Sequence, residues 1–401
     1  MRQGQSWNCS VLGWGEPRDP RTYSGYSRQV TQQIATRGAL RCEYSLKQLG
    51  PLDLFRGAIR LQWRGVRPRP VINRGWMWSR RGTELLNRRL DRMIRQKGDR
   101  GDFLQFGTLC EPSPRFGRHY VCGDMTIPQA HRAGQFAVAH LSDRQLAEAM
   151  SVQRCVLRNA HHIFAWTEWA RRSYIEDYDI APQKITVVYT GANMKFSADP
   201  NVKRNPHQIL FVGIDWERKG GPQLVEGFRL LRRQLPQAEL VVVGCQPKVN
   251  CPGVRVVGFL KPGDPVDERR LATLYLESSC FALMSDFEPL GIVMVEAYNA
   301  GLPVVAYDSG SRGEIIRDGK SGVLCPDRQP RTIADALLQV MSDSALRAAM
   351  AEEAKRLAKT VFTWENVVDK ISGVLAGPTL GPVSPALHDS AEQNTTSALR
   401  Q

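Results

Sequence analysis

The sequence lacks a long apolar run, and it lacks the cysteine spacing of a metal site or a disulfide framework. Its longest apolar runs, such as Leu240–Gly244, have the length of a strand, whereas a helix that crosses a bilayer needs about 18 residues or more. The first residues contain no apolar stretch typical of an export signal. The nine cysteines are scattered and include no Cys-x-x-Cys pair, so we expect reduced thiols, no metal and a cytoplasmic protein.

What is present is the composition of a globular protein with an excess of positive charge. The 401 residues are 42% hydrophobic and 23% charged, and a chain of this length usually forms two domains. The net charge is +14, and the segment Arg56–Arg100 alone contains fourteen basic and three acidic residues. Such a segment suits nucleic acid, anionic lipid headgroups or an anionic substrate.

Strand-like runs alternate with helical periodicity, and the alternation restarts after Ala192–Pro206. This pattern favours an α/β fold of two Rossmann-like, doubly wound domains, each with a parallel sheet. We predict an N-terminal domain over residues 1–195 and a C-terminal domain over 196–362. We also predict a helix over 363–376 that packs back toward the N-terminal domain, and a disordered tail over 377–401.

The expected elements follow from the spacing of apolar residues. In the first half we expect strands at Cys9–Trp14, Pro70–Asn73, Phe103–Phe106, His119–Cys122, Ile163–Trp166 and Ile185–Tyr189, and helices at Tyr26–Arg37, Thr83–Gln96 and Asp143–Asn159. In the second half we expect strands at Gln208–Val212, Glu239–Val243, Val254–Phe259, Cys280–Met284 and Pro303–Ala306, and helices at Pro222–Gln234, Glu268–Glu277, Gly291–Ala300, Ser311–Arg317, Thr332–Met341 and Ser344–Thr360.

The most informative motif lies at residues 286–297, between a predicted strand and a predicted helix. Gly291 allows a ligand to approach the backbone closely. The free N–H groups of Leu290, Gly291, Ile292 and Val293 would face that ligand at the positive end of the helix dipole. The motif therefore predicts a phosphate-binding helix N-terminus.

Two glutamates of this motif, Glu288 and Glu296, are eight residues apart, which is about 12 Å along a helix. The two carboxylates can therefore reach hydroxyl groups at opposite ends of an elongated polyol phosphate. Glu296 lies among apolar residues, where a carboxylate is costly unless it has a partner. A structural helix with a solvated Glu288 accounts poorly for Glu296.

This Glu-x7-Glu spacing in a Glu-Pro-Leu-Gly setting resembles the retaining glycosyltransferases of the GT-B fold, in the large family-four group (glycosyltransferases group 1). The resemblance is strong from about residue 150 to 376 and weak before about residue 100. It implies that a sugar nucleotide lies in the cleft between two domains, with Glu288 on the sugar hydroxyls and Glu296 on the nucleoside ribose. Further matching segments are Ile163–Gly191, Ala300–Ala306, Gly313–Ile316, Asp318–Gly322 and Phe362–Glu365.

A second motif follows the predicted strand Gln208–Val212, where Gly213 precedes a basic pair, Arg218 and Lys219. Positive charge at the carboxyl end of a strand suits the two phosphates of a nucleotide diphosphate and stabilises them as they leave. By resemblance Lys219 is the phosphate lysine. Ile214 stands where the family has an arginine, and either Arg218 compensates for it or its role is lost.

Three further residues complete the predicted site. Gly25, in the loop after the first strand, resembles the glycine that lets the first helix approach the donor phosphates, and Gly258 is assigned with Gly213 to donor binding. Asp124 follows the strand His119–Cys122, in a region where many relatives carry histidine. Asp124 either orients a substrate hydroxyl, as part of the catalytic set with Glu288, Lys219 and Arg218, or belongs to a helix N-cap.

The resemblance implies a hexosyl-type transferase that moves a sugar from a UDP- or GDP-linked donor to a hydroxyl acceptor, without a further cofactor. The acceptor would be a glycan, a lipid-linked glycan or a small molecule. Two alternatives are a nucleotide-sugar epimerase of the same fold and a non-catalytic sugar-nucleotide-binding subunit. Nucleic acid is not expected as a partner, because no known binding module is visible.

The basic segment contains an amphipathic helix whose arginines alternate with apolar residues. Leu85, Leu86, Leu90, Met93 and Ile94 share one flank, beside Arg88, Arg89, Arg92 and Arg95. One interpretation is an ordinary domain helix with a solvated basic face. The other is peripheral attachment to an anionic membrane surface, at the inner face of the membrane.

Overall fold

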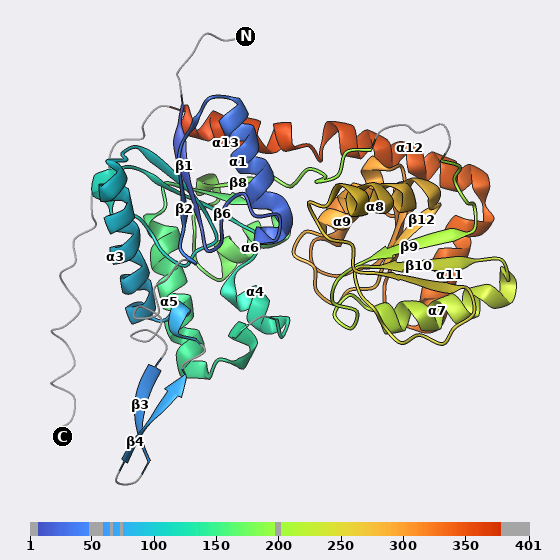
Figure 1. The fold of residues 1–401 in the computed structure, drawn as a ribbon, viewed down its shortest axis with the longest axis horizontal. Helices are drawn as coiled ribbons and strands as arrows, with labels where there is room; N and C mark the ends of the chain where they lie inside the picture. Colours follow the sequence, from blue (N-terminus) through green and yellow to red (C-terminus); the bar gives the residue numbers. More distant parts are fainter. Residues whose placement is uncertain are drawn as a thin grey trace, which may run out of the picture.

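The computed structural model describes residues 7–47, 59–64, 67–72, 75–135, 137–196 and 202–377. Two halves lie side by side, each built around one six-stranded sheet (Figure 1). The predicted disordered tail over residues 377–401 falls almost entirely outside the described residues.

The first half contains a fully parallel sheet with the strand order β2-β1-β5-β6-β7-β8. Its strands are β1 (Cys9–Gly13), β2 (Leu40–Ser45), β5 (Asp102–Phe106), β6 (His119–Gly123), β7 (His162–Ala165) and β8 (Ile185–Val187). Its helices are α1 (Tyr26–Thr36), α3 (Arg80–Lys97), α4 (Ile127–Arg132), α5 (Asp143–Asn159) and α6 (Glu168–Glu176), with the short 3-10 helix η1 (Thr22–Gly25) before α1.

The second half repeats this plan with the strand order β11-β10-β9-β12-β13-β14, again parallel throughout. Its strands are β9 (Gln208–Val212), β10 (Glu239–Val243), β11 (Val254–Gly258), β12 (Cys280–Leu283), β13 (Val304–Tyr307) and β14 (Gly322–Cys325). Its helices are α7 (Gly221–Gln234), α8 (Pro265–Glu277), α9 (Ile292–Asn299), α10 (Arg312–Ile315), α11 (Pro330–Ser342) and α12 (Ser344–Thr360).

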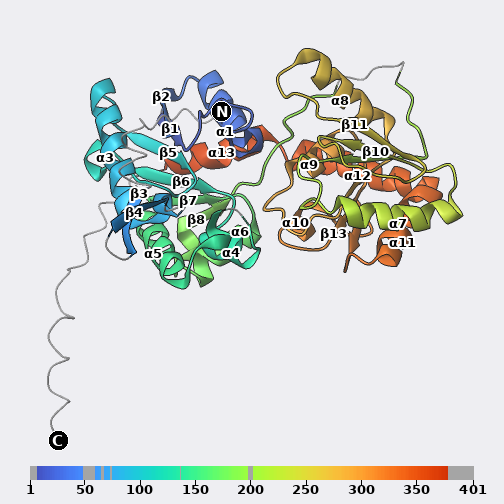
Figure 2. The same ribbon diagram turned by 60° about the horizontal axis from the view of Figure 1, so that its bottom comes forward.

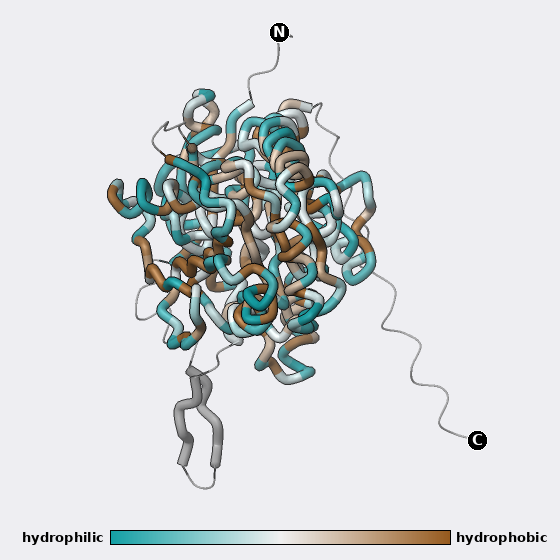
Figure 3. The backbone as a smooth tube through the Cα atoms, turned by 90° about the vertical axis from the view of Figure 1, so that its right-hand side faces the viewer, coloured by the Kyte–Doolittle hydropathy of each residue, from teal (hydrophilic) through white to brown (hydrophobic). Residues whose placement is uncertain are grey.

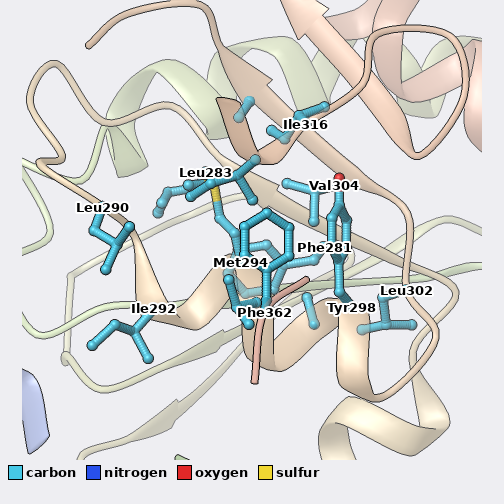
Figure 4. Packing of buried hydrophobic residues seen from close by; sticks show 14 of the residues in the cluster. Phe281, Leu283, Leu290, Ile292, Met294, Tyr298, Leu302, Val304, Ile316 and Phe362 are labelled. Atoms are coloured by element: carbon cyan, nitrogen blue, oxygen red, sulfur yellow. The ribbon is translucent and has the colours of Figure 1, made fainter. Parts of the chain in front are cut away.

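The cores lie between the sheets and their helices, as expected for parallel sheets that are covered on both faces. In the second half the central strands are almost completely buried, and α9 contributes Ile292, Met294 and Tyr298 to the same cluster as Phe281 of β12 (Figure 4). Hydrophobic and hydrophilic stretches alternate along the backbone of both halves (Figure 3). The two α/β units that the sequence predicts are therefore confirmed.

The last described helix, α13 (Trp364–Leu375), leaves the second half and lies against α1 of the first half (Figure 1). The indole Nε1 of Trp364 donates to the carbonyl of Ala192 at 2.8 Å, and the Trp364 ring meets the Tyr26 ring edge to face. Arg37 of the first half pairs with Asp369 at 2.7 Å. The C-terminal end of the described chain thus joins the two halves on one side.

Helix α3 has the predicted amphipathic pattern, but its apolar flank faces the protein. Leu86, Leu90 and Ile94 are fully buried and pack in one cluster with Leu12 of β1 and Phe103 of β5. The apolar flank therefore belongs to the core of the first half, and attachment of this helix to a membrane surface stays a prediction that concerns its basic face alone.

Three other predictions differ from the structure. The run Pro70–Asn73 is not a parallel strand, because β4 (Arg67–Ile72) pairs antiparallel with β3 (Ile59–Arg64) in a separate two-stranded sheet. The strands β2 and β14 were not predicted. The helix expected at Ser311–Arg317 shortens to α10, because Ile316 is already extended.

Candidate functional site

Most of the residues predicted to bind the donor gather at the carboxyl edge of the second sheet. Gly213 directly follows β9, Gly258 ends β11, and Gly291 precedes α9. A side chain on Gly213 would begin 3.0 Å from Cγ of Lys219, so this glycine makes room for the lysine stem. The edge of a parallel sheet at which its strands end is the usual ligand-binding position in such folds.

Lys219 and Glu288 form a buried ion pair at this edge. The ammonium of Lys219 donates to Oε2 of Glu288, and each side chain is only 12% exposed. Burial pushes the pKa of Glu288 up, but the charges of Lys219, Arg218 and Arg312 outweigh it, and the pKa lies below its ordinary value. Glu288 is therefore an anion held among three cations, and the net charge of this group is positive.

Arg218 contacts the loop that carries Glu288 through a backbone carbonyl rather than through the Glu288 carboxylate. Its guanidinium donates to the carbonyl of Phe287 at 3.2 Å and lies 3.3 Å from the carboxylate of Asp215. Ile214, four residues before Arg218 in the same loop, is 72% exposed. The structure therefore places Arg218 beside Glu288, while the position at which the family carries an arginine presents an apolar side chain to solvent.

The N-terminus of α9 lies next to the ion pair. Gly291 is its N-cap with φ at +76°, and no side chain of the described residues caps it. This left-handed backbone conformation favours glycine, and a side chain on Gly291 would also begin 2.3 Å from Cε of Met294, which would have to move. Leu290 and Ile292 are buried in the core (Figure 4), and Val293 is partly buried, so their side chains hold the backbone amides in place at a position suited to a phosphate.

Glu296 lies one and a half turns further along α9 and is 7% exposed. Its carboxylate accepts a hydrogen bond from the Tyr275 hydroxyl at 3.2 Å and another from the Asn193 backbone. Burial raises the pKa of Glu296 to about 7, although these two hydrogen bonds oppose the shift. The predicted ribose ligand is thus a carboxyl group that titrates near neutral pH.

Asn193 connects Glu296 to the first half. Its side-chain amide donates to the carbonyl of Ser24 at 2.8 Å. Tyr23, Ser24 and Gly25 are all left-handed, with φ of +49°, +52° and +82°. Two consecutive non-glycine residues in this region store strain, a feature often found at functional sites. Gly25 and Glu296, which sequence reasoning treated separately, therefore share Asn193 as a neighbour.

Asp124 follows β6 in the first half and is partly buried. Burial raises its pKa to about 6, the backbone N–H groups of Asp124 and Met125 oppose the shift, and the negative charge of Glu288 adds to it. Asp124 in the first half and Glu288 in the second half are therefore close enough for the charge of Glu288 to act on the Asp124 carboxyl group. The N-cap of α4 is Thr126, whose side chain accepts from the Gln129 N–H, so the N-cap interpretation of Asp124 is wrong.

The sequence analysis did not single out Arg312 and Glu314, although both form hydrogen bonds close to the loop that carries Glu288. Arg312 is fully buried and donates to the carbonyl of Ser285 at 2.5 Å and to the carbonyl of Ser309. Burial lowers the pKa of Arg312 to about 10, so the guanidinium remains charged near neutral pH. The available signal was their position after strand β13, at the same sheet edge as Gly213 and Gly291.

Within the described ranges, no group of three or more histidine, cysteine, aspartate or glutamate side chains is arranged to hold a metal ion. In the same part of the chain, no helix combines the length and the apolar character needed to span a bilayer.

Comparison with known proteins agrees with this geometry. Residues 194–357 match the family described as "Glycosyl transferases group 1". The chain is 29% identical over 281 residues to the D-inositol 3-phosphate glycosyltransferase of Corynebacterium kroppenstedtii, which covers 62% of this chain and 61% of that protein. It is 27% identical over 216 residues to the glycogen synthase of Mycobacterium tuberculosis, covering 50% of each. The alignments thus span between half and two thirds of these relatives.

Solved structures match over nearly the whole chain. The sucrose-phosphate synthase of Thermosynechococcus elongatus superposes with a TM-score of 0.65 at 16% identity, over 92% of this chain and 98% of that one. The Anabaena protein HepE, solved with UDP and glucose, superposes with a TM-score of 0.63 at 15% identity, over 91% and 99%. Since the two parallel six-stranded sheets have the arrangement found in these structures, the fold is GT-B, and residues 194–357 of its second half match the glycosyl transferases group 1 family.

Proposed function

We propose that the protein is a retaining glycosyltransferase that moves a sugar from a nucleotide diphosphate sugar to a hydroxyl acceptor. The observation that carries this proposal is the buried pair of Lys219 and Glu288 beside the uncapped N-terminus of α9. This arrangement offers fixed positive charge and free N–H groups to a diphosphate, and a carboxylate to sugar hydroxyls. Because Ile214 carries no charge where the resemblance implies an arginine, we assign the diphosphate to Lys219 and Arg218 instead.

The roles of the remaining residues follow from where they lie. Glu288 would accept hydrogen bonds from the sugar, and Glu296 would accept those of the ribose hydroxyls. Gly213, Gly258 and the amides of residues 290–293 would line the path of the diphosphate, and Gly25 would bring the N-terminus of α1 close to it. Asp124 would orient the acceptor hydroxyl from the opposite half.

In the proposed reaction, the bond between the sugar anomeric carbon and the diphosphate oxygen breaks while a bond to the acceptor oxygen forms on the same face. The acceptor proton passes to the departing phosphate oxygen, so no separate base is required. The positive charge of Lys219 stabilises the negative charge that develops on the leaving diphosphate, and such fixed charge is worth most where water is excluded.

For the substrates we propose the type of donor and the class of acceptor. HepE, with the same fold, binds UDP and glucose, which supports a UDP-linked donor over a GDP-linked one. The relatives act on inositol phosphate or glycogen by name, which supports a glycan or a small polyol as the acceptor. We further propose domain boundaries at residues 195 and 362, with α13 returning to the first domain.

The proposal also includes attachment to an anionic membrane surface, now through charge alone. The apolar flank of α3 is buried, but Arg81, Arg88, Arg92 and Arg95 are exposed on its outer side. These arginines can bind lipid headgroups without inserting any apolar side chain.

The test of the proposed function is an assay of nucleotide release with a panel of UDP- and GDP-sugars, each with and without an acceptor. A transferase releases nucleoside diphosphate in proportion to acceptor and forms a glycoside that keeps the donor's anomeric configuration. Release without acceptor would indicate the epimerase alternative, which acts by hydrolysis. Thermal stabilisation by a nucleotide sugar, about 2.7 kcal/mol at 100 times its Kd, with no turnover in any mixture would indicate a non-catalytic binding subunit.

A further inference from the structure

Glu314 of the second half binds the N-terminus of a helix in the first half. Its two carboxylate oxygens accept hydrogen bonds from the backbone N–H groups of Glu168 and Trp169, each at 2.7 Å. These are the first two residues of α6, whose N–H groups have no partner inside the helix. Figure 2 shows α6 and α10, which carries Glu314, on the facing sides of the two halves.

A second contact lies beside the first. The ring of Trp169 meets the ring of Phe287 edge to face, with 5.8 Å between the centroids. Phe287 belongs to the β12–α9 loop (residues 284–291) and directly precedes Glu288. The N-terminal turn of α6 therefore touches the second half twice, once at α10 and once at the loop that carries the proposed sugar ligand.

Within the first half, the same turn is fixed to the segment that follows Asp124. The carbonyl of Trp169 accepts from the side-chain amide of Gln129 at 2.8 Å. The hydroxyl groups of Ser173 and Thr126 are 2.6 Å apart. Since Thr126 is two residues after Asp124, a shift of α6 must move the Asp124 loop as well.

Within the second half, α10 is fixed to the β12–α9 loop. The Ser311 hydroxyl donates to the carbonyl of Pro289 at 2.7 Å. The buried guanidinium of Arg312 donates to the carbonyl of Ser285 at 2.5 Å. Glu314, two residues later, is therefore attached to the same loop as Glu288, and a continuous set of contacts joins Asp124 to Glu288 through α6 and α10.

We propose that Glu314 is a positioning residue that locks the two halves together and thereby sets the distance between Asp124 and Glu288. A carboxylate suits this role, since it offers an acceptor to each of two neighbouring N–H groups and its charge favours a helix N-terminus. This inference rests on the proposed function, because it assigns the acceptor to the Asp124 side and the donor to the Glu288 side. A merely local helix cap would come from the same half as the helix, as the Thr167 side chain does.

The test compares Glu314→Gln with a matched control, Glu226→Gln. Glutamine keeps the size of the side chain but places an amide N–H group against one of the two N–H donors. Glu226 lies in the same half, and among the described residues its carboxylate pairs with Arg229, one turn along its own helix. Wild type and both variants are measured by small-angle X-ray scattering and by an assay that separates sugar transfer from donor hydrolysis.

We expect Glu314→Gln to increase the radius of gyration, because the two halves separate when their contact is weakened, while Glu226→Gln matches the wild type. We expect UDP affinity to stay within about twofold, since the donor residues are untouched, and the ratio of transfer to hydrolysis to fall at least tenfold. A radius of gyration equal to that of the wild type would overturn the proposal, and so would an unchanged ratio of transfer to hydrolysis in a protein that transfers sugar.

The scattering measurement also tests the lock if the protein transfers no sugar, so failure of the proposed function and failure of the lock are distinguishable. If Glu314→Gln does not fold, Glu314→Asp replaces it, since aspartate keeps the charge but withdraws the carboxylate by one methylene. That variant should show the same increase in radius, and a radius equal to that of the wild type would overturn the proposal equally.

Discussion

Lys219 and Glu288 are 69 residues apart in the chain, yet the ammonium of one meets the carboxylate of the other between the loops that follow β9 and β12. The two strands are neighbours in the sheet, and this adjacency creates the pair. In the free protein the Lys219 ammonium helps to keep the buried Glu288 carboxylate ionised. A sugar nucleotide would bind with its diphosphate at the Lys219 ammonium and its sugar hydroxyl groups at the Glu288 carboxylate.

Replacement of Lys219 by alanine should lower turnover by roughly 10²–10³, because the leaving diphosphate loses its nearest buried cation. The change also leaves Glu288 buried without its main partner, so its pKa should rise. Lys355→Ala is the matched control, since Lys355 is only partly buried and pairs with Glu352 on its own helix. Steady-state kinetics with a saturating donor checks the prediction, and turnover that survives in Lys219→Ala but is lost in Arg218→Ala would exchange the two roles.

Replacement of Glu296 by glutamine should have opposite effects on stability and on binding. The pKa of Glu296 in the folded protein, about 7, lies above the ordinary value of a glutamate. The folded state therefore holds a proton that the unfolded state has already released, and stability declines as the pH rises from about 4.5 to 7. Removing the ionisable group should raise the free energy of unfolding at pH 8 by about 1–3 kcal/mol.

The same Glu296→Gln variant should bind UDP more weakly, by about 1.5–3 kcal/mol, because a charge-assisted hydrogen bond to the ribose is lost. In the wild type, UDP affinity should increase between pH 6 and pH 8 as Glu296 ionises, and the variant should not show this increase. Urea denaturation and calorimetry at the two pH values check both parts. Equal UDP affinity in the two proteins would remove Glu296 from the ribose.

Asp124 should impose a pH dependence on the transfer step. Its pKa is raised to about 6 by burial and by the charge of Glu288, so the carboxylate that accepts a hydrogen bond from the acceptor hydroxyl forms as the pH rises from 5 to 7. Turnover at saturating donor should rise over this range in the wild type and stay flat in Asp124→Asn. Saturating donor suppresses the contribution of Glu296, which acts on nucleotide affinity. A rise that persists unchanged in Asp124→Asn would assign it to another group.

Gly25 offers a comparison between two glycines of similar backbone conformation. Gly25 and Gly38 have φ of +82° and +70°, and a side chain on Gly38 would meet nothing within 4 Å, whereas one on Gly25 would begin 3.1 Å from the amide of Asn193. Each change to alanine should cost about 1 kcal/mol of stability from the left-handed backbone. Only Gly25→Ala should also weaken UDP binding, because Asn193 also donates to Glu296. Equal UDP affinity in both variants would separate Gly25 from the donor site.

The sequence was sufficient for the repeated α/β plan, because long apolar strands alternate with helices of clear periodicity in both halves. The sequence did not predict the short edge strand β2, whose first residues are only partly buried. It also did not predict the pairing of β3 with β4, because the pattern of one strand does not indicate which strand it pairs with. Element type follows from local patterns, whereas pairing depends on residues far away in the chain.

The candidate site likewise has features that follow from local sequence and features that depend on contacts between distant residues. The spacing of Glu288 and Glu296 is a local property of one helix and was visible in the sequence. The ion pair of Lys219 depends on the order of strands in the sheet, and the contact of Glu314 depends on how the two halves are placed. Helix α3 is the clearest example, because an apolar flank indicates that something covers it, and only the fold shows that Leu12 and Phe103 do so.

The remaining surface of α3 leads to a test of membrane attachment that no longer involves its apolar flank. Arg81, Arg88 and Arg92 are exposed on this helix, and each basic residue near an anionic bilayer is worth up to about 1 kcal/mol. The protein should therefore sediment with vesicles that contain phosphatidylserine, but not with neutral ones, and salt that shortens the screening length below about 10 Å should release it.

Changing these three arginines to glutamine should abolish sedimentation and leave UDP binding unchanged, because the donor residues lie in the other half. The matched control changes Arg233, Arg269 and Arg270 of the second half, which are equally exposed, and removes the same total charge. If attachment depends only on the net charge of +14, both triple variants should lose it equally. Loss confined to the α3 variant would assign the membrane contact to this helix, and absence of wild-type binding at low salt would make α3 a solvated face and favour a soluble acceptor.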